Sequence, residues 1–235
     1  MITGLHHVGI AVERLADACR FYRDVLGLPL VKEAEIADQG VRAALLAAGD
    51  SEIELLEPIG GASGMARFIA RHGEGLHHVC FETPDVAREL TAAKDKGAEL
   101  IDATPRDGLA GRIGFLHPRA CAGVLVELAT PFGAASRHDS PLRLARLVIG
   151  AKDPRDTAAV FQRVFAFPEL GSGDAGRALL RVGPGALSIV PVAEAGGLEG
   201  MAALDMIATD VDAVRAAVAA APTTHGVPLH ITRDQ

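Results

Sequence analysis

A five-residue motif occurs twice in this chain and limits what the chain can fold into. The sequence Gly-Leu-His-His-Val at residues 4–8 recurs letter for letter at residues 75–79, which is 71 residues later. Each copy opens a short apolar run, and each run is followed by a helical pattern that ends at a glycine, Gly27 or Gly97. Because self-similarity at a fixed spacing indicates repeated supersecondary structure, we expect two copies of one module in the first half of the chain.

The distal ends of the two copies also match. Glu54 stands between an isoleucine and a leucine, and 73 residues later Glu127 stands between a valine and a leucine. Between the helical pattern and this last strand, each copy holds apolar runs bounded by turn residues, at 41–47 and at 113–116. The sequence therefore predicts an α+β fold with paired βαβββ modules.

The two glutamates interrupt apolar strands in the same way. Successive side chains of a strand point to opposite faces, so Glu54 and Glu127 each face away from their apolar neighbours. One such glutamate alone could simply face solvent, but two in equivalent places, each with an equivalent histidine, favour a shared role. In the first histidine doublet, His7 shares its face with Gly9 and Ala11, which leave room for a ligand, whereas His6 shares its face with Val8 and Ile10. We therefore select His7 and His78, and assign His6 and His77 to packing or to the outer shell of a site.

Two histidines and two glutamates supply a mixed set of nitrogen and oxygen ligands. This set suits Co(II), Zn(II), Ni(II), Mn(II) or Fe(II) better than calcium. We predict one divalent metal ion bound by His7, Glu54, His78 and Glu127. Four protein ligands leave positions open for substrate oxygens, so the metal could act as a Lewis acid on a carbonyl group.

Charge and cysteine usage exclude several classes of protein. The formal net charge is −7 and the isoelectric point is near 5.7, which argues against a nucleic-acid-binding protein that works by neutralising phosphates. Three cysteines form no disulfide framework and are expected to be buried in a protein of a reducing compartment. No charged leader and no apolar run of about 18 residues occurs. We expect a cytoplasmic protein without membrane contact.

Six motifs in residues 1–132 resemble those of the methylmalonyl-CoA epimerase family, within the vicinal-oxygen-chelate superfamily of glyoxalases, bleomycin-resistance proteins and dioxygenases. They are His7-Val8-Gly9-Ile10-Ala11-Val12, Gln39-Gly40-Val41, Glu52-Ile53-Glu54-Leu55-Leu56-Glu57-Pro58, Gly73-Glu74-Gly75-Leu76-His77-His78-Val79, Phe115-Leu116-His117-Pro118 and Gly123-Val124-Leu125-Val126-Glu127-Leu128. The His/Glu pairs are shared across the superfamily, whereas the order and spacing of the motifs are more specific to the epimerases.

The resemblance implies the interconversion of (R)- and (S)-methylmalonyl-CoA by an isomerase. The metal, Co²⁺ in preference, would chelate the thioester and carboxylate oxygens of the acyl-CoA, acidify the α C–H and stabilise the enolate. Glu127 would be a ligand and a base, and Glu54 is the other candidate catalytic residue. Some family members carry a second basic glutamate where this chain has Ala43. His77, Glu54 or a metal-bound water are the substitutes that remain, and a homodimer is expected.

Two other functions remain open. A glyoxalase I-type isomerase or a ring-cleaving dioxygenase would use a similar ligand set. Dioxygenases of the superfamily bring additional histidines and tyrosines, and here Tyr22 is the only tyrosine and lies in a helical pattern. A non-catalytic small-molecule binder of the same fold would generally lack the complete quartet.

The second half of the chain resembles the first without its ligands. We divide the chain into a catalytic domain at 1–132, a linker at 133–143 and a degenerate, incomplete second copy at 144–235. Alignment of the copies puts Arg146 in the place of His7, Ser188 in the place of Glu54 and Ala203 in the place of His78. Arginine and alanine offer no metal ligand, so no metal is expected there. The alternative is an independent domain with a ligand of its own.

Overall fold

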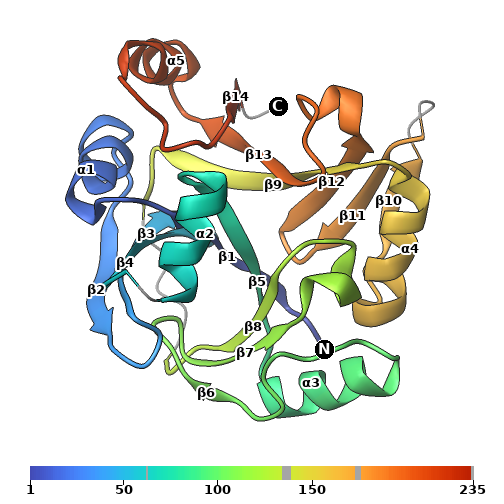
Figure 1. Ribbon diagram of the computed structural model, residues 1–235. Helices are drawn as coiled ribbons and strands as arrows, with labels where there is room; N and C mark the ends of the chain where they lie inside the picture. The colour runs from blue at the N-terminus through green and yellow to red at the C-terminus, as the bar shows by residue number, and fades with distance from the viewer. Residues whose placement is uncertain (62, 134–138, 173–175, 234–235) are drawn as a thin grey trace. The chain divides into compact units, whose positions relative to one another are not determined.

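Three stretches of the chain repeat the order strand, helix, three strands in the computed structural model, which describes residues 1–61, 63–133, 139–172 and 176–233 (Figure 1). The first module contains β1 (Gly4–Ala11), α1 (Leu15–Cys19) continued by the π-helix η1 (Arg20–Val25), β2 (Leu30–Ile36), β3 (Val41–Ala48) and β4 (Ser51–Pro58). The second contains β5 (Gly75–Glu82), α3 (Val86–Asp95), β6 (Arg106–Asp107), β7 (Arg112–Leu116), the short η2 (Pro118–Cys121) and β8 (Val126–Thr130). The predicted α+β fold of βαβββ modules is confirmed.

The remaining elements continue the pattern. The third module contains β9 (Leu142–Ala151), α4 (Pro154–Phe165), β10 (Glu169–Ser172), β11 (Ala178–Val182), β12 (Gly185–Pro191) and the short η3 (Val192–Glu194). A partial fourth module contains β13 (Gly200–Ala208), α5 (Val211–Ala220) and β14 (Leu229–Arg233). A further helix, α2 (Gly64–His72), joins the first two modules and was not predicted.

Each complete module arranges its four strands in the same spatial order. The first strand pairs in parallel with the last strand of its module, which pairs antiparallel with the third, and the third with the second. The resulting orders are β1-β4-β3-β2, β5-β8-β7-β6 and β9-β12-β11-β10. In the first two modules this order places the strand that carries His7 or His78 beside the strand that carries Glu54 or Glu127.

The chain forms two compact units, and each consists of three separate segments of the sequence. The first unit contains Met1–His6, His78–Ala135 and Arg146–Ala203, and the second contains His7–His77, Ser136–Ala145 and Leu204–Gln235. Each unit thus combines segments from both halves of the chain. The division at 132 and 143 stays a prediction, because residues 134–138 of the predicted linker lie outside the described residues.

Helices α3 and α4 each pack against strands of their own module. In the first compact unit α3 contacts β7 and β8, and α4 contacts β11 and β12. Phe81 of β5 is fully buried and packs against two aromatic residues of the third module, with ring centroids 5.3 Å from Phe165 and 5.0 Å from Phe167. The second and third modules therefore share an aromatic core.

Local signals begin and end the helices. The side chains of Asp85, Asp153 and Asp210 cap the N-termini of α3, α4 and α5 by accepting backbone N–H groups. The glycines predicted to stop the first two helical patterns have left-handed backbones, with φ of 75° at Gly27 and 82° at Gly97. Among the described residues, no helix is both long and apolar enough to cross a lipid bilayer.

Candidate metal centre

The first predicted ligand pair lies on neighbouring strands of the second compact unit. Glu54 of β4 stands opposite Gly9 of β1, so His7, two residues before Gly9, shares its face of the sheet. The Nε2 atom of His7 lies 3.4 Å from Oε2 of Glu54. Both side chains are buried, with exposed fractions of 0% and 6%.

The second pair repeats this arrangement in the first compact unit. Glu127 of β8 stands opposite Cys80 of β5, and His78 precedes Cys80 by two residues. The Nε2 atom of His78 lies 3.3 Å from Oε2 of Glu127, and both side chains are again buried. Each pair could supply one imidazole nitrogen and one carboxylate oxygen to a divalent metal ion, which accords with the predicted donor set.

The leading histidine of each doublet is placed differently. His6 and His77 are only half-buried, whereas His7 and His78 are buried. The His77 ring packs edge-on against Phe68 of α2 with centroids 4.7 Å apart. Strand alternation thus separates the two histidines of a doublet as the sequence predicted.

The face that carries the second pair also carries two residues that sequence reasoning missed. Phe115 stands opposite Glu127, and its ring lies edge-on to that of His78 at 5.6 Å. Arg106 of β6 stands opposite Ile113, which shares the face of Phe115, and its guanidinium carbon lies 5.6 Å from the centre of the Phe115 ring. The position of Arg106 beside Phe115 depends on how the two-residue strand β6 pairs with β7.

Arg106 retains hydrogen-bonding capacity near the pair. Its Nε atom lies 3.4 Å from Oδ1 of Asp102, whose Oδ2 accepts the backbone N–H of Phe115 at 3.0 Å. Its Nη1 atom is buried and has no hydrogen-bond partner among the described residues. A buried guanidinium N–H without a partner is costly, and an anionic ligand would satisfy it.

The corresponding positions of the first module hold smaller side chains. Strand pairing puts Leu45, Ala43 and Ala34 where the second module has Phe115, Ile113 and Arg106. Ala43 is fully buried and supplies only a methyl group, so it is no substitute base. Glu52 stands opposite His7 on the same face and is a further carboxylate there.

Comparison with known proteins identifies the superfamily. The Glyoxalase/Bleomycin resistance protein/Dioxygenase superfamily matches residues 6–115. The uncharacterized protein YqjC of Bacillus subtilis is 41% identical over 130 residues, which are 55% of this chain and 93% of that protein. The mitochondrial methylmalonyl-CoA epimerase of Mus musculus is 36% identical over 126 residues, which are 53% of this chain and 71% of that protein. This chain belongs to the Glyoxalase/Bleomycin resistance protein/Dioxygenase superfamily.

A solved structure agrees with this assignment. A methylmalonyl-CoA epimerase in complex with methylmalonyl-CoA and NH4+ is 38% identical in sequence to this chain, with a TM-score of 0.56. The match covers 58% of this chain and 99% of that one. The predicted resemblance and the predicted enzyme class, an isomerase of the epimerase type, are confirmed. The matches extend over little more than half of the chain.

Tyr22 is not available as a catalytic residue in this chain. Its side chain is buried, and its hydroxyl group donates to the backbone oxygen of Thr224 at 3.1 Å. Burial raises the pKa of Tyr22 well above its ordinary value, because the charged form would lose its hydration. Tyr22 therefore stays a neutral, structural phenol.

The third module keeps the strand pairing and changes the ligands. Arg146 stands opposite Ala186 and Ser188 opposite Val148, which is the register that His7 and Glu54 have in the first module. The Arg146 side chain is exposed. The chemistry of these two residues offers no counterpart to the buried His–Glu pairs.

Proposed function

We propose that this protein epimerises methylmalonyl-CoA with one divalent metal ion bound by His7, Glu54, His78 and Glu127. The observation that carries the proposal is the pair of buried His–Glu contacts with the same strand register and nearly the same distance, 3.4 Å and 3.3 Å. The names of the related epimerases support the reaction and the acyl-CoA substrate.

The donor atoms suit such an ion. A buried carboxylate is costly unless a positive charge compensates it, and each pair brings one carboxylate beside an imidazole. Two imidazoles and two carboxylates match Co²⁺, the family's expected metal, as well as Zn²⁺, Ni²⁺, Mn²⁺ and Fe²⁺. When bound, the ion would withdraw electron density from the thioester and carboxylate oxygens and so acidify the α C–H.

Side chains of the protein would remove and return the α-proton of the substrate. Glu127 is our candidate for the base that removes the α-proton, because its carboxylate is buried and stands opposite Phe115 on the neighbouring strand. Inversion needs a proton donor on the opposite side of the α-carbon. Ala43 cannot serve, and we propose Glu52 for this role ahead of His77, because Glu52 shares the face of His7 and His77 packs on α2. Glu54 would act as a ligand.

Arg106 is our candidate for the residue that holds the anionic substrate. Its guanidinium group lies over the Phe115 ring, which is itself edge-on to His78, and its buried Nη1 has no hydrogen-bond partner in the part of the chain that the structure describes. A carboxylate or phosphate oxygen of the acyl-CoA would accept this N–H and order the substrate over Phe115.

Proton exchange and metal content test the proposal together. Incubation with methylmalonyl-CoA in D2O should replace the α-hydrogen with deuterium, as followed by NMR. Rapid turnover of the glutathione hemithioacetal without exchange on the CoA ester would instead support the glyoxalase alternative. Metal analysis of Glu54→Gln and Glu127→Gln separates one shared site from two, because each variant should lose the same single equivalent. Retention of half of the bound metal by either variant would contradict one shared site.

A further inference from the structure

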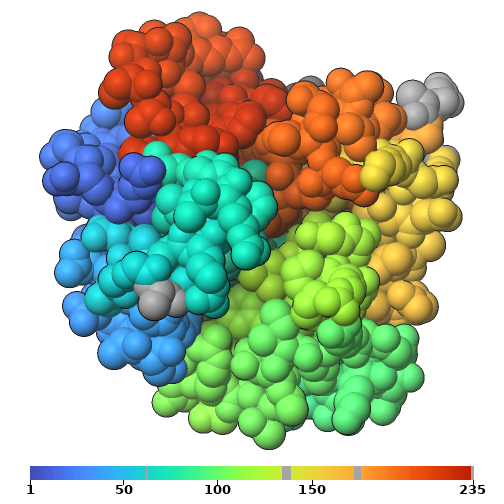
Figure 2. Space-filling model, in the orientation of Figure 1, coloured from blue at the N-terminus to red at the C-terminus, as the bar shows by residue number. Residues whose placement is uncertain are grey.

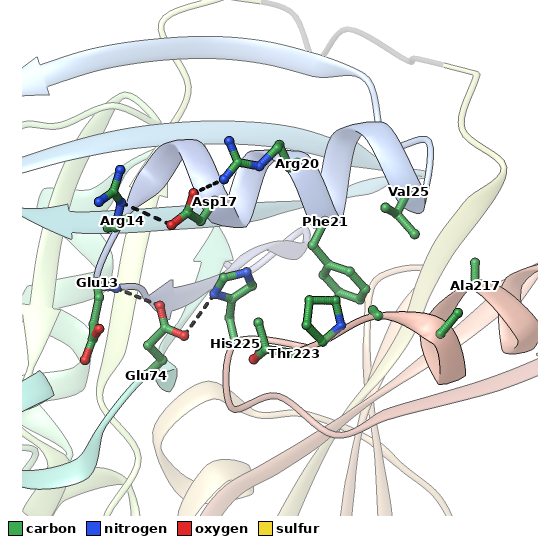
Figure 3. A pocket seen from close by; sticks show the side chains of 13 residues that line it. Glu13, Arg14, Asp17, Arg20, Phe21, Val25, Glu74, Ala217, Thr223 and His225 are labelled. Carbon is green, nitrogen blue, oxygen red and sulfur yellow. Dashed lines mark hydrogen bonds and ion pairs between the residues drawn. The ribbon is translucent and has the colours of Figure 1, made fainter.

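The second compact unit contains a cavity whose lining includes none of the four predicted metal ligands. It has a volume of about 690 Å³ and lies between the first helix and the segment that follows α5 (Figure 3). In Figure 2 the red atoms of the C-terminal segment border the blue atoms of the first helix. Cavities of about 300–1,000 Å³ are typical of small-molecule sites.

Most of the wall is apolar. The first helix contributes Phe21 and Val25, and the C-terminal segment contributes Ala217, Ala220 and Pro222. Figure 3 shows the Phe21 ring pointing from the helix toward the C-terminal segment. Such a wall favours an apolar ligand body through removal of its surface from water.

One buried imidazole faces this cavity with a free edge. His225 is only 4% exposed, and its Nδ1 atom lies 2.9 Å from Oε2 of Glu74. Because a carboxylate only accepts hydrogen bonds, Nδ1 carries the proton that Glu74 accepts, and in this tautomer Nε2 is an acceptor. No hydrogen bond to Nε2 is present among the described residues.

Glu74 fixes this imidazole in place. Its Oε1 atom accepts the backbone N–H of Glu13 at 2.8 Å, so the carboxylate joins the end of β1 to His225 (Figure 3). The next residue of the loop, Gly226, has φ of 71° and approaches the Glu74 backbone so closely that a Cβ atom would lie 2.0 Å from the Glu74 oxygen. The loop is therefore built to hold His225 at this position.

The charges of the wall select against an anion. Arg14 and Arg20 both bind the carboxylate of Asp17, as the dashed lines in Figure 3 show. Among the described residues that line the wall, Glu13 and Glu74 add two more carboxylates and there is no further arginine. A carboxylate or phosphate ligand would meet net repulsion, whereas an uncharged ligand would not.

We infer that this cavity is a second binding site, which takes an uncharged, mainly apolar molecule whose single hydroxyl group donates to Nε2 of His225. The site is independent of the proposed epimerase chemistry. The first module and the partial fourth module build it jointly. It therefore gives a binding role to the half of the chain that lacks the His–Glu pairs.

Two probes with one ring system test the head group. We would titrate the full-length protein with 1-naphthol and 1-naphthoate by isothermal titration calorimetry. The alcohol should bind at least tenfold more tightly than the carboxylate. Comparable binding of 1-naphthoate, or no heat with 1-naphthol up to its solubility limit, would overturn the inference.

Two substitutions with one matched control test the location. Ala217→Trp should fill the cavity and abolish binding, whereas Ala219→Trp on the exposed side of the same helix should leave it unchanged. His225→Asn preserves a donor for Glu74 and tolerates the residue's φ of 55°, but it lacks Nε2 and should weaken 1-naphthol binding severalfold. Unchanged binding by both cavity variants, with circular dichroism showing an intact fold, would place the probe elsewhere and refute the site.

Discussion

The first and third modules fold alike and differ at the positions of the proposed metal ligands. Both arrange their strands in the same order, and the register that pairs Gly9 with Glu54 also pairs Val148 with Ser188. The difference is that a buried imidazole and carboxylate in the first module correspond to Arg146 and Ser188 in the third. Strand order therefore depends on the apolar alternation, whereas the site depends on two side chains of one face.

The first and second modules differ in a second way. They share the His–Glu pair, but the second surrounds its pair with Phe115, Ile113 and Arg106, and the first offers alanines at two of the three corresponding positions. Small side chains leave space and large ones supply contacts. The two modules thus surround their His–Glu pairs with side chains of different size.

The largest effect is expected from removal of the carboxylate charge in the second module. Glu127→Gln should lower α-proton exchange by roughly 10²–10⁴-fold, because the amide neither accepts the proton nor compensates the metal charge. NMR in D2O measures the exchange, and metal analysis measures the loss of the ion. Ser188→Ala is the matched change in the third module and should alter neither quantity. A Glu127→Gln enzyme with full exchange would remove Glu127 from the proposed mechanism.

The asymmetry between the first two modules predicts the next effect. Arg106→Met should raise KM for methylmalonyl-CoA by about tenfold to a hundredfold with a smaller change in kcat, because a charge-assisted hydrogen bond contributes about 1.5–3 kcal/mol. The methylmalonyl thioester of pantetheine, which lacks the CoA phosphates, identifies the anion that Arg106 binds. If Arg106→Met raises KM equally for this substrate, the anion is the carboxylate, and if KM does not change, the anion is a CoA phosphate. Arg112→Met is the control, since Arg112 is exposed and pairs with Asp107. Equal effects of the two substitutions would contradict a specific role for Arg106.

The sequence predicted the parts that depend on local order. Alternation along a strand distinguishes His7 from His6, and the repeat relates His78 to His7, so the order of residues alone was enough to propose the two pairs. Arg106 could not be proposed in this way, because its neighbours depend on how a two-residue strand pairs across a turn. His225 could not either, since its contact with Glu74 joins residues 151 positions apart.

Packing between modules gives a smaller expected effect. Phe81→Leu should lower the free energy of unfolding by about 1–2 kcal/mol, because it removes two edge-to-face aromatic contacts and leaves a partial void. Urea unfolding monitored by circular dichroism measures the change. Phe132→Leu is the matched control, since that ring is 64% exposed and should contribute little. Equal stability of the two variants would show that the second and third modules do not stabilise each other through Phe81.

The smallest effect concerns the aspartate helix cap, which occurs in a module with a His–Glu pair and in a module without one. The Asp153 carboxylate accepts the backbone N–H groups of Arg155 and Asp156 and so caps α4, as Asp85 caps α3 in the second module. Asp153→Ala should lower the free energy of unfolding by about 1 kcal/mol, and Asp153→Asn, which keeps an acceptor oxygen, by less. Asp85→Ala should cost no more than this, because Asp85 accepts only one backbone N–H, that of Arg88, at a helix of similar length. Chemical unfolding of the three variants measures this, and metal content should remain at the wild-type level. If Asp153→Ala left stability unchanged while Asp85→Ala lowered it, the third module would not unfold together with the second, and the shared core around Phe81 would not couple them.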